Sequence, residues 1–233
     1  MRFKTRLLTF SLAIILLFGF IAASASATAG DVPLRDVPPD IWFHDYVQTG
    51  LRHGFIQGTG GNSFHPDRII TRSEFVSILG RVHQALGGEL LEEGIMPPYI
   101  DINPSFYIPY LAWASEMGII YGDGQGRFRP YSPVTRQEMA TILTRYIESF
   151  DLRPYLASRH NPIGRYEDWH LIAPWAYGAA HLLRDYNIMQ GSRGVQNVPG
   201  VYFFRPTDVG FRREAVAIFA RLFIAIYYDF PAQ

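Results

Sequence analysis

The stretch 70-ITRSEFVSILGRV-82 decides the fold, because it combines a helix start with one apolar helix face. Thr71 is followed three residues later by Glu74, which is the spacing of a capping box. After the box, apolar residues recur at i, i+1, i+3, i+4 and i+7, so they share one side of an α-helix. These residues are Phe75, Val76, Ile78, Leu79 and Val82. The stretch therefore predicts an amphipathic helix that begins next to Thr71.

Two later stretches repeat this pattern. The stretch 134-VTRQEMATILTRY-146 keeps the capping box as Thr135 and Glu138, whereas 210-GFRREAVAIFARL-222 has Phe211 at the Thr position. An arginine follows the cap position in each copy, eight residues after the Phe of a Phe-x-Pro turn and nine residues before a second arginine. The turn residues are Phe64, Phe128 and Phe204; the first arginines are Arg72, Arg136 and Arg212; the second are Arg81, Arg145 and Arg221. This agreement of spacings indicates an internal repeat.

A second helix is expected upstream in each copy, over about 43–53, 107–117 and 176–186. Each ends at a residue that tolerates the left-handed conformation of a helix C′ position, namely Gly54, Gly118 and Asn187. An aromatic residue lies twelve positions before each of these stops, and an aspartate lies further upstream. The aromatic residues are Trp42, Phe106 and Trp175, and the aspartates are Asp36, Asp101 and Asp168.

A lone helical hairpin of this size cannot bury its apolar face, so such units pack on their neighbours. We therefore predict one all-α domain of three helical-hairpin repeats around a shared core. The expected bounds are 28–83 for repeat 1, 99–150 for repeat 2 and 165–228 for repeat 3. The connecting segments are punctuated by Gly and Pro, with some helical continuation expected.

Residues 1–27 have the features of a secretory signal peptide: a cationic start, an apolar run and small residues at 25–27. An uncleaved N-terminal anchor is the alternative. This segment contains three basic residues and no acidic ones, so removing it from the neutral chain leaves a net charge of −3. A negative balance argues against nucleic acid and against an anionic membrane surface as partners. The chain contains no cysteine, which excludes disulfides.

The sequence does not predict an enzyme. The seven histidines are scattered without metal-ligand spacing, and there is no Gly-x-Ser-x-Gly motif and no cysteine nucleophile. Glu74 and Glu138 are explained as capping residues. The segment 123-DGQG-126 lacks the further acidic ligands of a calcium loop and is expected to form a turn. We therefore expect no catalytic residue, no metal and no cofactor.

Two segments resemble S-layer homology (SLH) domains: 36-DVPPDIWFHDYVQTGLRHGFIQGTGGNSFHPDRIITRSEF-75 and 103-NPSFYIPYLAWASEMGIIYGDGQGRFRPYSPVTRQEMATIL-143. The shared features are Asp-Val-Pro, the aromatic before the first helix, Gly-Ile-x-x-Gly, Phe-x-Pro and Thr-Arg-x-Glu. With its third copy, the chain is similar to a tandem of three SLH repeats. The resemblance implies a pseudo-threefold trimer in which each repeat gives one helix to a central three-helix bundle. It also implies a secreted protein of the cell wall, cell surface or S-layer.

In this family, grooves between the repeats bind cell-wall polysaccharide. The typical ligand is a secondary cell wall polymer with pyruvate ketals, or otherwise a peptidoglycan-linked glycan. A pyruvate carboxylate would suit Arg72, Arg136 and Arg212, because a helix N-terminus offers free N–H groups and a positive dipole, and a guanidinium adds charge-assisted hydrogen bonds. The alternative is an ion pair, of Arg72 with Asp67 or of Arg136 with a carboxylate of a neighbouring repeat.

Three further sets of equivalent residues are candidate ligand contacts, each with a structural alternative. Trp42, Phe106 and Trp175 would stack on a sugar ring or pack in the core. Asp36, Asp101 and Asp168 would bind sugar hydroxyls or cap a turn. Gly58, Gly122 and Gly191 would admit a sugar close to the backbone or serve a turn.

The third copy lacks the Thr cap and has seven extra residues between Gly191 and Phe204. We therefore expect it to form the weakest ligand site, or one with altered specificity, with Arg212→Ala costing less binding than the same change at Arg72 or Arg136. Two functions remain open from the sequence. One is non-covalent anchoring to the cell wall by a module without further cargo. The other is an exported helical-repeat module that binds proteins or assembles an S-layer, with degenerate wall binding.

Overall fold

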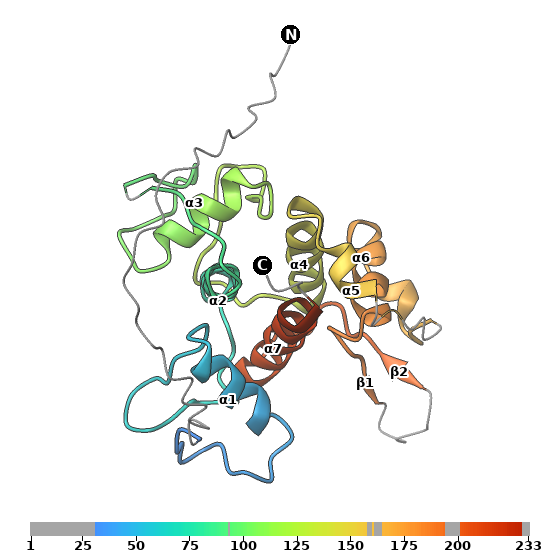
Figure 1. Ribbon diagram of the computed structural model, residues 1–233. Coiled ribbons are helices and arrows are strands. Elements are labelled where there is room, and N and C mark those ends of the chain that lie inside the picture. Colours follow the sequence, from blue (N-terminus) through green and yellow to red (C-terminus); the bar gives the residue numbers. More distant parts are fainter. Residues whose placement is uncertain (1–30, 93, 158–159, 161–164, 194–200, 230–233) are drawn as a thin grey trace, which may run out of the picture. The chain divides into compact units, whose positions relative to one another are not determined.

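The computed structural model describes residues 31–92, 94–157, 160, 165–193 and 201–229, which are coloured in Figure 1. Contacts divide the chain into two units after Gly30, and every helix and strand of the described residues lies in the second unit, from Asp31 onward. The expected signal peptide at residues 1–27 lies outside the described residues.

The described chain is mostly helical, which confirms the predicted all-α class. Its elements are α1 (His44–Arg52), α2 (Arg72–Ala85), α3 (Ile108–Glu116), α4 (Arg136–Ser149), α5 (Arg153–Leu156), α6 (Pro174–Asp185) and α7 (Arg212–Asp229), with a short 3₁₀ turn at Trp169–Leu171. The sequence did not predict the antiparallel ribbon of β1 (Ser192–Arg193) and β2 (Tyr202–Phe203), which uses part of the extra length of the third copy. Among the described residues, no helix has the length and hydropathy needed to cross a membrane.

The predicted starts of the second helices are confirmed by their caps. In α2, the Glu74 N–H donates to Thr71 Oγ1 at 3.3 Å, and the Thr71 N–H donates to Glu74 Oε2 at 3.0 Å. In α4, the Thr135 N–H donates to Glu138 Oε2 at 2.8 Å. Half of the box survives in α7, because the Phe211 N–H still donates to a Glu side chain, Glu214 Oε2, at 3.1 Å.

The predicted stops of the first helices are confirmed by backbone geometry. Gly54, Gly118 and Asn187 have φ angles of 75°, 66° and 57°, which is the left-handed conformation. A short chain reversal follows in each copy and leads to the Phe-x-Pro turn. The side chains of Phe64, Phe128 and Phe204 in these turns are buried in the core.

Each first helix packs most extensively against a helix of another repeat (Figure 1): α1 with α7, α3 with α2, and α6 with α4. For example, the ring of Phe55, just after α1, lies 5.3 Å from the ring of Phe223 in α7. Each repeat is thus a helix–turn–helix in sequence, but its first helix covers the second helix of the repeat before it. Repeat 1 closes the cycle by covering repeat 3.

The backbone at the starts of the second helices repeats this cycle. The Ile70 N–H donates to Gly210 O at 3.0 Å, the Gly210 N–H donates to Val134 O at 3.0 Å, and the Val134 N–H donates to Ile70 O at 3.2 Å. These three bonds form a closed ring through the three repeats. The rings of Phe75 and Phe219 join α2 to α7 at 4.7 Å. The packing of α2, α4 and α7 into one central bundle stays a prediction.

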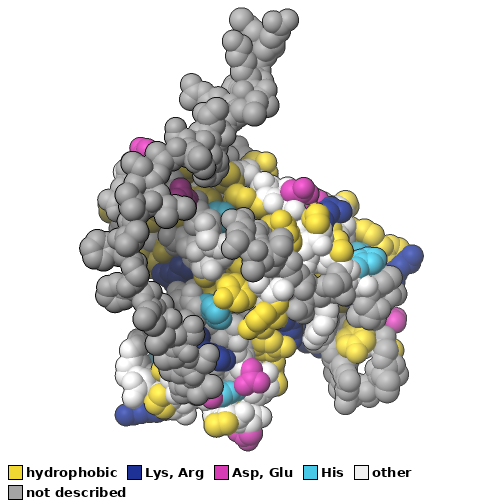
Figure 2. All heavy atoms as spheres, in the orientation of Figure 1, with side chains coloured by type: hydrophobic (Ala, Val, Ile, Leu, Met, Phe, Trp, Pro, Cys, Tyr) yellow, Lys and Arg dark blue, Asp and Glu magenta, His cyan; other side chains and the backbone are white. Residues whose placement is uncertain are grey.

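On the face shown in Figure 2, acidic and basic side chains are interspersed with hydrophobic ones rather than gathered by sign. Several aromatic side chains are exposed among the described residues, including Trp42, Phe106, Tyr121, Tyr131 and Trp175. Contiguous exposed apolar patches mark interaction or ligand-binding surfaces, whereas single exposed apolar residues are normal. Three of these five are the residues that the repeat pattern singles out as candidate ligand contacts.

Candidate functional site

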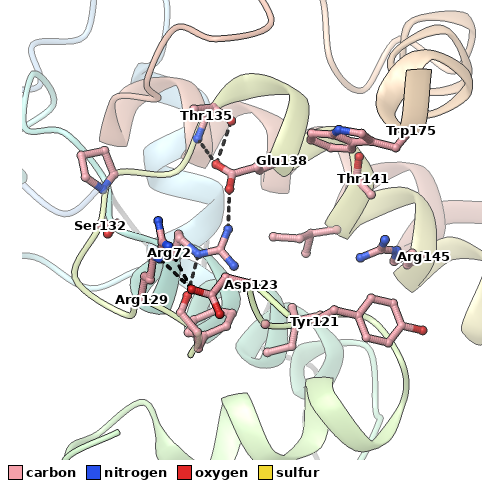
Figure 3. A pocket seen from close by; sticks show the side chains of 15 residues that line it. Arg72, Tyr121, Asp123, Arg129, Ser132, Thr135, Glu138, Thr141, Arg145 and Trp175 are labelled. Atoms are coloured by element: carbon pink, nitrogen blue, oxygen red, sulfur yellow. Dashed lines mark hydrogen bonds and ion pairs between the residues drawn. The ribbon is translucent and has the colours of Figure 1, made fainter. Parts of the chain in front are cut away.

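Two grooves of the described chain are built from equivalent residues. The first, here the α4 groove, is a cavity of about 470 Å³ whose lining includes Arg72, Tyr121, Gly122, Glu138, Arg145 and Trp175 (Figure 3). The second, here the α2 groove, is a cavity of about 320 Å³ whose lining includes Arg212, Gln57, Gly58, Glu74, Arg81 and Phe106. Each member of the first set has its counterpart, in the same order, in the second.

Each groove draws on all three repeats. The α4 groove takes its first arginine from repeat 1, its glycine loop and helix from repeat 2, and its aromatic side chain from repeat 3. The α2 groove takes the same parts from repeats 3, 1 and 2. This arrangement results from the cyclic packing, because each first helix lies on the second helix of the preceding repeat. A single repeat therefore cannot form a groove.

The helix starts are not open to an anion, which corrects the expectation from the sequence. In α2, the Arg72 N–H donates to Ser132 O at 3.0 Å, and the Ser73 N–H donates to Pro130 O at 3.0 Å. The equivalent N–H groups of α4 and α7 likewise donate to carbonyl oxygens of the next repeat. The helix N-termini thus serve contacts between repeats, so only side chains are left to bind an anionic ligand.

Arg72 lines the α4 groove but is already partnered. Its Nε donates to Phe128 O at 2.9 Å, and its Nη1 forms an ion pair with Glu138 Oε1 at 2.6 Å. The ion-pair alternative therefore applies to Arg72, although with Glu138 rather than with Asp67, which pairs with Arg213. The side chain retains 14% exposure, so part of the guanidinium still faces the groove.

Arg136 and Arg212 are more deeply buried, each with 8% exposure. Arg136 Nε donates to Phe204 O at 2.6 Å, and its Nη2 donates to Gln190 O at 3.1 Å. Arg212 Nε donates to Phe64 O at 2.9 Å. Burial lowers the pKa of both arginines, that of Arg212 to about 10, which still leaves Arg212 charged at neutral pH. All three first arginines thus connect a helix start to the Phe-x-Pro turn of the next repeat.

The second arginines are functional candidates that the sequence alone did not single out. Arg145 lines the α4 groove and Arg81 lines the α2 groove, and both are half-buried. The Arg145 guanidinium lies 4.6 Å from the centre of the Tyr121 ring, and Figure 3 shows no hydrogen bond or ion pair from it to the other residues drawn. The signal was present in the sequence, since these arginines keep a constant nine-residue spacing from the first ones.

The three predicted aromatic residues point outward. Trp42, Phe106 and Trp175 have exposures of 56%, 59% and 56%, whereas the next residue in each copy is buried. Core packing does not fit these values. Phe106 lies in the α2 groove and Trp175 in the α4 groove, while Trp42 lines a different cavity. Stacking on a sugar stays the prediction for these side chains.

The aspartates hold the Phe-x-Pro turns, which favours their structural alternative. Asp168 Oδ1 accepts from the Phe204 N–H at 2.7 Å, and its Oδ2 accepts from the Arg205 N–H at 2.6 Å. Asp36 and Asp101 make the same two contacts in their own copies. The middle residue of each turn is left-handed, with φ of 55° at His65, 59° at Arg129 and 55° at Arg205. Such residues cost conformational energy that the two hydrogen bonds help to offset.

Burial alone would raise the pKa of Asp36. The backbone N–H groups of Phe64 and His65 outweigh burial and lower this pKa overall, because they stabilise the charged carboxylate. The group is therefore an anion at neutral pH, and its oxygens face protein donors.

We expect Asp168→Ala to lower the free energy of unfolding by about 2–3 kcal/mol, because it leaves two N–H groups of a strained turn without an acceptor. Urea denaturation measures this loss. Asp36→Ala is the matched control, since Asp36 makes the same bonds but is more exposed than Asp168, and its loss should be smaller. Equal stability of the wild type and Asp168→Ala would contradict the turn-holding role.

The glycines are explained by close backbone approach. A Cβ atom on Gly58, Gly122 or Gly191 would lie 3.2, 2.8 or 2.9 Å from the carbonyl oxygen of Ser63, Arg127 or Phe203. The turn alternative therefore accounts for all three, although Gly58 and Gly122 also line the grooves.

Arg136 contacts Gln190 O, just before the divergent loop of the third copy, whereas Arg212 makes the equivalent contact with Gln57 O of repeat 1. Arg212 lies in the α2 groove, whose loop belongs to repeat 1. The predicted ranking of the arginine variants stays untested. The structure nevertheless makes Arg136, and not Arg212, the arginine that borders the altered loop. Residues 194–200 of the insertion lie outside the described residues.

Comparison with known protein families finds matches in the first two repeats. The S-layer homology domain model matches residues 33–76 and 98–140. The surface-layer 125 kDa protein of Lysinibacillus sphaericus is 31% identical over 130 residues, which is 54% of this chain and 11% of that protein. The S-layer protein sap of Bacillus anthracis is 24% identical over 202 residues, 84% of this chain and 23% of that protein.

An endoglucanase of Bacillus sp. (strain KSM-635) is 26% identical over 220 residues, 92% of this chain and 22% of that protein. The chain thus spans less than a quarter of the length of each of these three relatives. The segment similar to this chain thus occurs in two surface-layer proteins and in an endoglucanase. The two family matches cover the first helix, the Phe-x-Pro turn and the capped start of the second helix in repeats 1 and 2, so residues 33–76 and 98–140 are S-layer homology domains.

Proposed function

We propose that the chain binds an acidic polysaccharide of the bacterial cell wall in the α4 and α2 grooves, and thereby holds a protein non-covalently at the cell surface. The observation that carries this proposal is the repeated pairing, in both grooves, of an exposed aromatic side chain with a second arginine. The pairs are Trp175 with Arg145 and Phe106 with Arg81.

This pairing suits a sugar that carries a carboxylate. The flat face of Trp175 or Phe106 offers an apolar surface for a pyranose ring. The planar guanidinium of Arg145 or Arg81 binds a carboxylate through two parallel hydrogen bonds, which a lysine cannot do. A pyruvate ketal places a carboxylate next to a sugar ring, so a pyruvylated secondary cell wall polymer is the ligand we propose.

We infer that the chain acts by binding and not by catalysis. The acidic side chains in the grooves are occupied: Glu138 pairs with Arg72 and accepts from the Thr135 N–H, and Glu74 pairs with Arg68 at 2.6 Å. The pKa of Glu74 is raised by burial but lowered overall by its bonds to Arg68 and Thr71, which is the opposite of what a general acid needs.

Sedimentation with purified cell-wall sacculi that carry a pyruvylated polymer tests the proposal. We expect the protein to sediment with intact sacculi and to stay in the supernatant once pyruvate, or the whole secondary polymer, has been removed chemically. Loss with pyruvate removal alone identifies the carboxylate as the group recognised. Sedimentation with the sacculi that is unchanged by both treatments would contradict the proposal and favour binding to a wall protein. Release of soluble wall fragments would reveal catalysis.

A further inference from the structure

The α4 groove continues into a second cavity, here the side cavity, of about 300 Å³. The two share Thr141, Arg145 and Trp175, and the side cavity is also lined by Thr144, Arg153 and Ala179. We propose that the side cavity is a second sugar subsite, so that the α4 groove binds at least two consecutive units of the polymer. This inference rests on the proposed function of the groove.

At the other two junctions between repeats, a tyrosine side chain occupies the position equivalent to the side cavity. Arg81 Nε donates to Tyr110 Oη at 3.3 Å, and Arg221 Nε donates to Tyr46 Oη at 3.2 Å. Both tyrosines lie eight residues before the helix stop, and the residue at that position of α6 is Ala179. The ring that holds the second arginine is therefore missing beside α4.

The loss of this ring has two consequences for the site. Arg145 contacts the Tyr121 ring, which belongs to the α4 groove, and borders both cavities. The space beside α6 is bounded by the small residues Gly178 and Ala179. Between repeats 1 and 2, by contrast, the Tyr110 ring lies so close to Gly80 of α2 that a Cβ atom on Gly80 would come within 2.5 Å of it.

The side cavity offers polar groups suited to a sugar. Thr144 has only 9% exposure, and its hydroxyl has no hydrogen-bond partner among the described residues. Arg153 of α5 pairs with Glu148 of α4 at 2.7 Å, and both side chains are about half exposed. A carboxylate and a guanidinium next to one another match vicinal sugar hydroxyls, which donate to one and accept from the other. The volume lies at the lower end of the range for small-molecule sites, about 300–1,000 Å³.

The test compares a single pyruvylated sugar with a fragment of two or more units from the same polymer, by isothermal titration calorimetry on the full chain. We expect the wild type to bind the longer fragment about ten-fold more tightly. The double variant Thr144→Ala/Ala179→Tyr recreates the Ala220 and Tyr46 pair found at the equivalent positions between repeats 3 and 1. It should lose this gain and keep the affinity for the single sugar.

Arg153→Gln is the second variant, and it leaves the helix core untouched because Arg153 is half exposed. It should weaken only the longer fragment, by about three-fold or more. Unchanged preference for the longer fragment in both variants would overturn the second subsite while leaving the proposed function intact. If the wild type bound neither sugar, the proposed function itself would fail.

Discussion

Replacing Arg136 by Ala is expected to lower the free energy of unfolding by about 3–5 kcal/mol, a large share of the 5–15 kcal/mol typical of a domain. The guanidinium donates to Phe204 O at 2.6 Å and to Gln190 O at 3.1 Å, with 8% of the residue exposed. Its removal leaves two carbonyl groups of repeat 3 without their charged donor, and leaves a cavity between repeats 2 and 3. Because one cycle of contacts joins the repeats, the damage should appear as lower stability of the whole domain.

Urea denaturation followed by circular dichroism measures this loss. Arg136→Lys should fall between the wild type and Arg136→Ala, because an ammonium keeps the charge but does not have the planar fork that reaches two carbonyl groups. Arg145→Gln is the matched control, since this half-buried arginine faces the α4 groove, and its stability should change by less than about 0.5 kcal/mol. A loss of unfolding free energy below about 1 kcal/mol for Arg136→Ala would show that the contacts of Arg136 between repeats contribute little to stability.

The double variant Arg81→Gln/Arg145→Gln is expected to weaken binding to sacculi by about 100-fold or more. A hydrogen bond to a charged group contributes about 1.5–3 kcal/mol, which is about ten- to hundred-fold in affinity for each arginine. Two grooves that bind one polymer act together, so losing both should cost more than either single change. Titration of sacculi against a fixed amount of protein gives the two affinities.

The control must carry the same change in net charge. Arg35→Gln/Arg52→Gln removes two exposed arginines that line neither groove, and we expect it to change binding by less than two-fold. Equal losses in the two double variants would indicate general attraction to an anionic wall rather than recognition in the grooves. Unchanged binding of Arg81→Gln/Arg145→Gln would remove these arginines from the site.

The features that the sequence predicted correctly are local in the chain. The capping box joins Thr71 to Glu74 within one helical turn, and the left-handed stops at Gly54, Gly118 and Asn187 depend on the conformation of a single residue. The repeat itself is evident from spacings of eight, nine and twelve residues. Period and spacing also placed Trp175 and Phe106 at equivalent positions, although they did not indicate which groove each would line, and their contact with a sugar stays a prediction.

The partners across repeats were decided by the tertiary structure. Arg72 contacts Phe128 across 56 positions of the chain, and Arg212 contacts Phe64 across 148 positions, because the third repeat closes onto the first. The same closure occupies these helix N–H groups with carbonyl oxygens, which is why the expectation of free N–H groups at the helix starts was wrong, while ligand binding by the first arginines stays a prediction.

The sequence by itself determined which segments become the paired helices of the three copies, where the second helices begin and where the first helices end, because caps, stops and apolar faces depend on residues within a few turns of one another. Only the tertiary structure decided that each groove combines three repeats and that the second arginines line the grooves together with the first. The physical reason is that a helix of this length buries its apolar face only against other helices, and the local pattern does not say which ones.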